Sequence, residues 1–312
     1  MGLLIHVARI LVLPLLVLAA FFLGVYSGRY NVFSFDFLGE VDSYEAETQL
    51  GSRPAFVPRV DAYGRNVFTR EKQEVSCPEQ HKDTGVILVV GQSNSANHAS
   101  FKYHTRYNSQ VFNYLSGKCF VAASPLLGAT GEKGEFATML ADELVSRGVY
   151  RSVVLVASGV GGSTVSQWGN SGPFGEALYV NLLGVREAFR VTDIVWHQGE
   201  SDFEVGTTSD KYINSFKEFL SRVGSAGVEA PVFISISTIC GKSKSWQRDN
   251  SVSLAQRALI DNSKVFLGAD TDALLAWEDR NPADYCHLGE SGQRKTAAAY
   301  AAAISHYHLG HY

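Results

Sequence analysis

The chain has no excess of basic residues: its 312 residues carry a formal net charge of −4 at pH 7. A general nucleic-acid-binding protein needs a basic face to neutralise phosphates, so the composition argues against that class. Internal repeats of roughly 20 to 50 residues, which mark solenoids and propellers, are also absent. The hydrophobic fraction of 46% and the charged fraction of 19% are those of a folded globular protein.

Cysteine is scarce, and the four that occur form no C-x-x-C pair and have no histidine at zinc-finger spacing. They are Cys77, Cys119, Cys240 and Cys286. Four cysteines allow three alternative disulfide pairings, and their spacing alone does not choose among them. The histidine-rich end of the chain, HYHLGHY, lacks a nearby acid and is interpreted as a solvated tail. We therefore expect neither a metal nor a cofactor.

One long uncharged run interrupts the globular composition near the N-terminus. Residues 10–28 read ILVLPLLVLAAFFLGVYSG, between Arg9 and Arg29. These nineteen residues can cross a hydrocarbon core of about 30 Å and exceed the apolar core of roughly 7 to 15 residues in a signal peptide. We expect residues 1–28 to be an uncleaved transmembrane anchor with its short tail in the cytoplasm, or alternatively a signal sequence. The remaining chain would then be membrane-anchored and extracytoplasmic.

Residues 29–83 show no sustained period and are interpreted as a connector that packs partly on the main domain, residues 84–312. In that domain, short apolar runs alternate with helix-like segments. The predicted strands lie at residues 86–90, 153–157, 193–197, 231–239 and 264–268, and the predicted helices at 134–147, 174–190, 209–223, 249–261 and 290–305. This alternation predicts an α/β fold: a three-layer sandwich with a central parallel sheet, flavodoxin-like, covered on both faces.

Ligands bind such sheets beyond the carboxyl ends of the strands, so the loops after the strands are the candidate site. The first is GQSNSAN, residues 91–97, where glycine permits a sharp turn and Ser93 can point into a crevice. The alternative is that Ser93 or Asn94 merely caps a helix. The G-x-S-x-G elbow of another serine hydrolase fold is absent, because position 95 is serine.

A nucleophilic serine needs a base and an orienting acid, and the segment NPADYCHLGESGQ offers both. Asp284 precedes His287 by three residues. Within a turn, this spacing lets the carboxylate bond one imidazole nitrogen while the other nitrogen faces the serine. An Asp and a His on an ordinary surface loop are the alternative.

Acyl transfer also needs hydrogen-bond donors for an oxyanion. The loop SGVGGSTVSQW, residues 158–168, supplies glycines, and it lacks both G-x-G-x-x-G and G-K-[ST], which argues against a phosphate loop. The loop WHQGESD, residues 196–202, supplies the Gln198 amide. Its acids Glu200 and Asp202 raise the alternative of a carboxylate pair for glycoside hydrolysis, which would leave the serine and histidine loops unexplained.

These four blocks, GQSN, GVGGS, WHQGESD and Asp284-x-x-His287 followed by Leu-Gly, resemble in order those of the SGNH hydrolases. They are most similar to the sialate O-acetylesterase-like carbohydrate esterases, over about residues 84–308. The resemblance implies Ser93 as nucleophile, His287 as base and Asp284 as its partner. It further implies an oxyanion hole formed by the Ser93 N–H, a glycine N–H assigned to Gly162, and the Gln198 side chain.

Other positions of these blocks are expected to contact substrate or orient loops: Gln92, Asn94, Glu200 and Trp168. The resemblance implies an esterase that removes O-acetyl groups from a glycan through an acetyl-serine intermediate. The alternatives are an O-acetyltransferase acting on a surface polysaccharide, and a non-catalytic carbohydrate-binding module. The expected partners are an acetylated carbohydrate and, through the N-terminal helix, a membrane; the sequence carries no information on protein partners.

Two cysteines are expected at the catalytic end of the sheet. Cys240 directly follows the predicted strand 231–239, and Cys286 neighbours His287. We therefore predict a Cys240–Cys286 disulfide that stiffens the loop of the base, with Cys77–Cys119 as the complementary pair.

Overall fold

The computed structural model describes residues 58–242 and 246–310. The segment predicted to be a membrane anchor and most of the predicted connector lie outside these residues. Among the helices of the described segments, none combines the length and apolar character that a membrane crossing requires. The described residues belong to one compact unit, Val57–Tyr312, so residues 58–83 are part of the domain.

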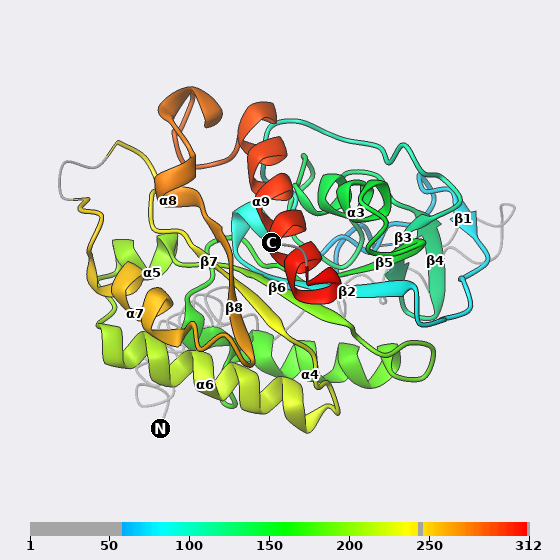
Figure 1. Ribbon diagram of the computed structural model, residues 1–312, viewed down its shortest axis with the longest axis horizontal. Coiled ribbons are helices and arrows are strands. Elements are labelled where there is room, and N and C mark those ends of the chain that lie inside the picture. The colour runs from blue at the N-terminus through cyan, green and yellow to red at the C-terminus, as the bar shows by residue number, and fades with distance from the viewer. Residues whose placement is uncertain (1–57, 243–245, 311–312) are drawn as a thin grey trace, which may run out of the picture. The chain divides into compact units, whose positions relative to one another are not determined.

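An eight-stranded sheet forms the centre of this unit (Figure 1), in the order β1-β4-β3-β5-β2-β6-β7-β8. Six neighbouring strands are parallel: β3 (Val111–Leu115), β5 (Ser152–Ala157), β2 (Thr84–Gly91), β6 (Asp193–His197), β7 (Val232–Ile236) and β8 (Val265–Asp270). At one edge, β4 (Lys118–Val121) pairs antiparallel with β3 on one side and with β1 (Glu74–Val75) on the other. The predicted parallel sheet is therefore correct for six strands, and the edge makes the whole sheet mixed.

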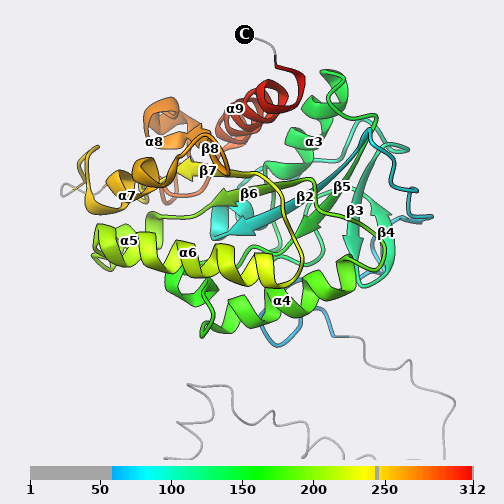
Figure 2. The same cartoon turned by 60° about the horizontal axis from the view of Figure 1, so that its bottom comes forward.

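Helices cover both faces of the sheet (Figure 2). On one face lie α3 (Ala137–Ser146) and α9 (Glu290–Leu309), and on the other lie α4 (Pro173–Val185), α6 (Ser209–Ser225) and α7 (Ser251–Leu259). Short helical turns occupy loops: η1 (Ser93–Ser95), η2 (Val165–Trp168), α5 (Glu200–Glu204), α8 (Thr271–Leu274) and η3 (Trp277–Asp279). The five predicted helices thus correspond to α3, α4, α6, α7 and α9.

Strand β2 explains the layered architecture. All eight of its residues are buried, and successive side chains point to opposite faces of the sheet. Val86, Leu88 and Val90 pack in one hydrophobic core with residues of α4 and α6, whereas Ile87 and Val89 pack in a second core with residues of α3 and α9. A strand that is apolar on both faces is typical of the centre of a parallel sheet.

The hairpin β3–β4 was not predicted from the sequence. Its turn residues Ser116 and Gly117 have φ values of 48° and 83°, and positive φ at both central positions is typical of a type I′ turn. The run VFNYL was obscured by Asn113, whose buried side chain accepts a hydrogen bond from Leu127 N at 2.7 Å instead of facing solvent. A buried polar residue whose hydrogen-bond partners are distant in the sequence interrupts the apolar pattern by which a strand is predicted.

The parallel strands fix the position of the candidate site. Because β2, β5, β6 and β7 run in the same direction, their carboxyl ends meet at one edge of the sheet. The loops that follow β2, β5 and β6 are the three that carry GQSN, the glycines and QGE.

Candidate active site

Ser93 lies where β2 ends and the short turn η1 begins. Gly91 has φ +135°, and a Cβ there would lie 2.1 Å from the carbonyl oxygen of His197, so the close approach of β6 requires glycine. The cap of η1 is Gln92 and involves no side-chain hydrogen bond, so Ser93 and Asn94 do not serve as caps. Ser93 is 6% exposed, and no intramolecular acceptor binds its hydroxyl or backbone N–H within the described residues.

Asp284 and His287 form the predicted pair. His287 Nδ1 lies 2.8 Å from Asp284 Oδ2, and Asp284 Oδ1 accepts hydrogen bonds from the backbone N–H groups of Cys286 (2.9 Å) and His287 (3.0 Å). Burial raises the pKa of Asp284, but these hydrogen bonds, led by that of His287, outweigh burial and hold the pKa below its usual value. The carboxylate therefore stays ionised beside the imidazole.

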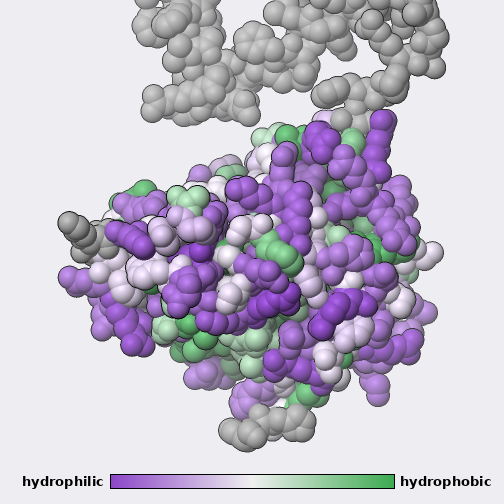
Figure 3. Space-filling view, turned by 90° about the horizontal axis from the view of Figure 1, so that it is seen from above, coloured by the Kyte–Doolittle hydropathy of each residue, from purple (hydrophilic) through white to green (hydrophobic). Residues whose placement is uncertain are grey.

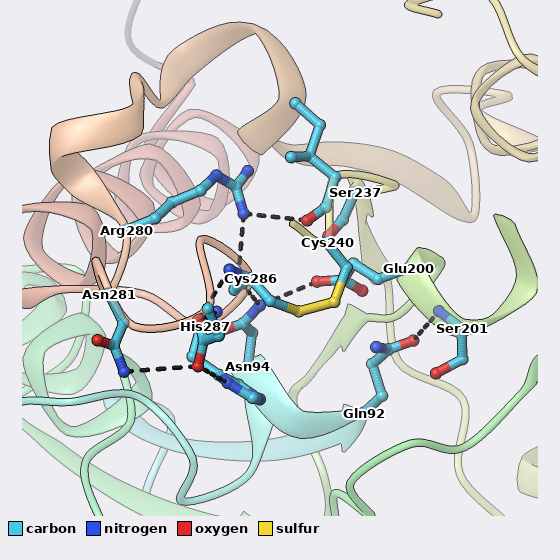
Figure 4. The surroundings of a disulfide bond; sticks show 12 residues. Gln92, Asn94, Glu200, Ser201, Ser237, Cys240, Arg280, Asn281, Cys286 and His287 are labelled. Carbon is cyan, nitrogen blue, oxygen red and sulfur yellow. Dashed lines mark hydrogen bonds and ion pairs between the residues drawn. A yellow bond between two sulfur atoms is a disulfide. The ribbon is translucent and has the colours of Figure 1, made fainter. Parts of the chain in front are cut away.

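The Asn94 side chain joins the serine turn to the histidine loop (Figure 4). Its Oδ1 accepts from Leu288 N at 3.0 Å, and its Nδ2 donates to Cys286 O at 3.2 Å, so it holds the residues on both sides of His287. Asn94 thereby links the turn that carries Ser93 to the loop that carries His287, and the described residues show no direct hydrogen bond between Ser93 and His287. Such bonds often form only when substrate is bound.

Glu200 is the third partner of Asn94, accepting from Nδ2 at 2.9 Å. Burial raises the pKa of Glu200, whereas the nearby His197 imidazole and the Asn94 amide lower it, and the net shift is downward. Asp202 is also buried and accepts from Val165 N and Thr207 Oγ1, each at 2.7 Å. Both acids are therefore internal, and the arrangement offers no accessible carboxylate pair for glycoside hydrolysis.

The Gln198 amide is directed into the protein. Its Nε2 donates to Asp202 Oδ2 at 2.5 Å and Ser163 O at 3.1 Å, and lies 3.2 Å from Gln92 Oε1. The residue is 0% exposed, and its two amide hydrogens already face strong acceptors. Gln198 therefore has no free side-chain N–H with which to stabilise an oxyanion, contrary to the expectation. Its contacts instead hold Ser163, the residue that follows Gly162.

Gln92 is likewise internal and orients a loop. Its Oε1 accepts from Gly199 N at 3.2 Å and Ser201 N at 3.1 Å, at the start of α5 (Figure 4). Gln92, Asn94 and Glu200 thus connect loops to one another rather than line a surface.

The glycine loop offers an exposed backbone donor. Gly161 N donates to Thr130 Oγ1 at 2.8 Å, and a Cβ at Gly161 would lie 2.7 Å from the His98 ring. Gly162 is exposed, has φ +70°, and its N–H has no acceptor within the described part of the chain. Gly162 therefore remains the candidate donor of this loop.

Trp168 does not reach solvent. It is 1% exposed, and its Nε1 donates to Ser163 Oγ at 3.0 Å. Of the two roles expected for Trp168, burial of its ring in the core with Phe174 leaves no surface for contact with substrate, whereas its bond to Ser163 is consistent with orienting the glycine loop.

Both predicted disulfides are present. Cys240 is bonded to Cys286 and Cys77 to Cys119. The first bridge is reinforced by the buried Arg280, whose Nη1 donates to Ile239 O and Cys286 O, each at 3.1 Å (Figure 4). The loop that carries the histidine is thus covalently and electrostatically tied to the end of β7.

Sequence reasoning missed two residues of this site, Arg280 and His98. The His98 ring stacks on His287 with centroids 5.8 Å apart and planes at 20°. Burial lowers the pKa of His98, and the neighbouring His287 and Lys133 lower it further, so a neutral ring is favoured there. His98 stands five positions after Ser93, and that proximity was the available signal; the sequence offered none for Arg280.

The fold and these residues together define an SGNH-type carbohydrate esterase. The chain belongs to the family described as carbohydrate esterase, sialic acid-specific acetylesterase, whose model matches residues 83–306. It is an enzyme that acts on ester bonds.

The chain is similar to solved structures of low sequence identity. A protein of Arabidopsis thaliana is similar at 15% identity and a TM-score of 0.54, covering 72% of this chain and 99% of its own. NanS (14% identity, TM-score 0.47) covers 73% of this chain and 98% of its own. A family 3 carbohydrate esterase of Talaromyces cellulolyticus (11%, TM-score 0.45) covers 73% and 100%. No curated protein sequence matches the chain.

Proposed function

We propose that the protein is a serine-dependent O-acetylesterase that removes acetyl groups from a glycan. Ser93 is the nucleophile, His287 the general base and Asp284 its orienting partner. The observation that supports this assignment is the Asn94 side chain, which bonds on both sides of His287 while it neighbours Ser93 in the chain. The free N–H groups of Ser93 and Gly162 are the proposed oxyanion donors.

In the first half of the reaction His287 takes the Ser93 proton as the hydroxyl oxygen attacks the acetyl carbonyl. The tetrahedral oxyanion is stabilised by the two backbone N–H groups. The C–O bond to the sugar breaks, and His287 returns the proton to the leaving sugar oxygen. Asp284, bonded to Nδ1, stabilises the transient imidazolium and fixes the tautomer whose Nε2 accepts protons.

In the second half a water molecule replaces the sugar. His287 removes its proton, the hydroxide attacks the acetyl-serine carbonyl, and acetate leaves as the proton returns to Ser93. Gln198 and Asp202 contribute by holding Ser163 and Val165, the residues that follow Gly162 in the oxyanion loop.

The serine assignment is tested by comparing Ser93→Ala with Ser95→Ala. Ser95 lies in the same turn, and its hydroxyl donates to Gln92 O at 2.8 Å. We expect Ser93→Ala to lower kcat/KM for 4-nitrophenyl acetate by about 10³-fold or more, and Ser95→Ala to lose about 1 kcal/mol of stability with most activity retained. Equal activities of Ser93→Ala and wild type would refute the mechanism.

Water is the proposed acceptor, since the family is one of esterases. Acetate release is measured with and without added oligosaccharide, while mass spectrometry follows acetylation of that sugar. Acetylated oligosaccharide formed at the expense of acetate would instead indicate a transferase. Sugar binding without any turnover would indicate a carbohydrate-binding module.

We further propose that the catalytic domain is held outside the cytoplasm by residues 10–28. The uncharged length of this segment and two disulfides, which persist in oxidising compartments, support the proposal. Labelling of intact cells with a membrane-impermeant amine reagent should modify the full-length protein in the membrane fraction. Labelling that occurs only after lysis would contradict this location.

A further inference from the structure

A partly buried imidazole, that of His98, lies against the loop of the base. Its ring stacks on that of His287, with the centroids 5.8 Å apart and the planes at 20°. The face of the molecule on which the start of α9 lies in Figure 1 is mostly hydrophilic, with small separated hydrophobic areas (Figure 3). Packing contacts, rather than an exposed apolar patch, therefore distinguish the residues next to the catalytic pair.

The same ring is fitted closely against the glycine loop. A Cβ at Gly161 would lie 2.7 Å from His98 Nε2, and its three nearest atoms would all belong to the His98 ring. A Cβ at Gly131, which has φ +87°, would lie 2.8 Å from the ring carbon Cδ2. A side chain at either position would displace the ring, so the contact between His98 and the glycine loop depends on glycine. One ring thus touches both the base and the loop that carries the proposed oxyanion donor.

Thr130 joins His98 to the backbone of the glycine loop. Its hydroxyl accepts from Gly161 N at 2.8 Å and lies 3.1 Å from His98 Nε2. Because the hydroxyl already accepts one N–H, its own hydrogen can donate to Nε2, and the neutral ring then carries its proton on Nδ1. Burial and the neighbouring His287 and Lys133 lower the pKa of His98, which favours the neutral ring that this bond requires.

We propose that His98 is a positioning residue for the reaction, holding the His287 ring and the oxyanion loop in a fixed relation. The stack restricts the plane of the His287 ring, and the Thr130 hydroxyl carries the constraint to Gly161, the residue before the proposed donor Gly162. The inference rests on the proposed function, because His98 acts only through the base and the oxyanion donor. His98 transfers no proton in this role.

Substitutions at His98 separate the ring stack from the hydrogen bond. His98→Phe keeps an aromatic ring without an acceptor for Thr130, His98→Gln keeps an acceptor without a ring, and His98→Leu keeps neither. Since a displacement of about 1 Å in a reacting group can lower the rate about 10²-fold, we expect kcat for 4-nitrophenyl acetate to fall about tenfold in His98→Phe and His98→Gln, and about 30-fold to 100-fold in His98→Leu. KM should stay within about twofold of wild type, because the loss lies in the transition state.

Thr130 variants test the link between the ring and the glycine loop. Thr130→Ser keeps the hydroxyl and should retain kcat within about twofold, whereas Thr130→Val should lower kcat about tenfold. Because His98→Phe and Thr130→Val remove the same hydrogen bond, the double variant should also lose only about tenfold. Separate losses that multiply to about 100-fold would show that the two residues act independently, and would overturn the link.

Thr105→Val is the matched control for lost stability. The Thr105 hydroxyl also accepts a backbone N–H, from Tyr107 at 3.0 Å, and donates to a side chain, Asp142 Oδ1, at 2.5 Å. We expect Thr105→Val to lower the free energy of unfolding at least as much as Thr130→Val, because its partner is a carboxylate, and to leave kcat unchanged. Equal kcat values for these two variants, or wild-type kcat in all three His98 variants, would overturn the positioning role.

The Ser93→Ala variant keeps this inference distinguishable from the proposed function. Loss of activity in Ser93→Ala together with full activity of the His98 variants would refute the positioning role and leave the serine mechanism intact. Full activity of Ser93→Ala would refute the mechanism and, with it, the role of His98.

Discussion

Replacing Asn94 by alanine tests whether tertiary hydrogen bonds position the base. Asn94 is 0% exposed and makes three hydrogen bonds: to Leu288 N, Cys286 O and the Glu200 carboxylate. Truncation leaves all three groups without this partner in the interior. A buried unsatisfied group costs about 1 to 3 kcal/mol, with charged groups at the upper end. Allowing for a water molecule that enters the vacated space, we expect a loss of about 3 to 5 kcal/mol in the free energy of unfolding.

The catalytic effect of Asn94→Ala should exceed what lost stability explains. Without Asn94 the residues on both sides of His287 are released from the Ser93 turn. A displacement of about 1 Å in a reacting group can lower the rate about 10²-fold. We expect kcat for 4-nitrophenyl acetate to fall by about this factor at a temperature and pH where the variant remains folded, as shown by urea unfolding.

Asn113→Ala is the matched control. Asn113 is 1% exposed, accepts from Leu127 N at 2.7 Å, and donates to Leu127 O and Leu155 O at 3.2 and 3.3 Å. It therefore has a comparable set of buried hydrogen bonds, and none of them involves the histidine loop. We expect a similar loss of stability with kcat within a few fold of wild type. If the two variants lost stability and kcat equally, Asn94 would have no positioning role.

Two further outcomes follow from the site. The disulfides Cys240–Cys286 and Cys77–Cys119 span similar sequence separations of 46 and 42. Replacing either pair by serines should therefore lower the free energy of unfolding by a similar amount, about 4 kcal/mol. Only loss of Cys240–Cys286 should also lower kcat, by about tenfold, and equal kcat values for the two variants would argue against a stiffened histidine loop. The depressed pKa of Asp284 stabilises the folded state at pH values above the unfolded pKa of about 3.9, and that stability is lost as pH falls through the folded pKa. In Asp284→Asn the free energy of unfolding should therefore decline less steeply between about pH 4 and 2, and kcat should be about 10³-fold lower. If the variant and wild type lost stability equally over this pH range, the ionised Asp284 carboxylate would not be the group that stabilises the folded state.

The elements that sequence predicted well are those with one dominant local signal. The run 86–90 is apolar on every residue, which predicts a central parallel strand, and β2 occupies Thr84–Gly91. The spacing of Asp284 and His287 keeps both within one turn, and the 2.8 Å contact forms within that turn. The disulfide pairing followed from the same reasoning, because the ends of parallel strands converge at one edge.

Predictions failed for side chains whose local sequence does not determine whether they point into the protein or toward a substrate. Nothing local indicates that Gln198 donates to Asp202 and Ser163 rather than toward a substrate, since the difference depends on acceptors 4 and 35 positions away. The same applies to Trp168, whose ring packs inside the core.

The order of strands, helices and chemically competent loops was encoded in apolar patterning and turn residues, which act over a few neighbouring positions. The tertiary structure alone determined which groups meet: Asn94 contacts Glu200, Cys286 and Leu288 across separations of 106, 192 and 194 residues. Such contacts depend on how the layers pack. Burial removes water as a competing partner, so each buried polar group must form its hydrogen bonds with groups of neighbouring segments, which can be distant in the sequence.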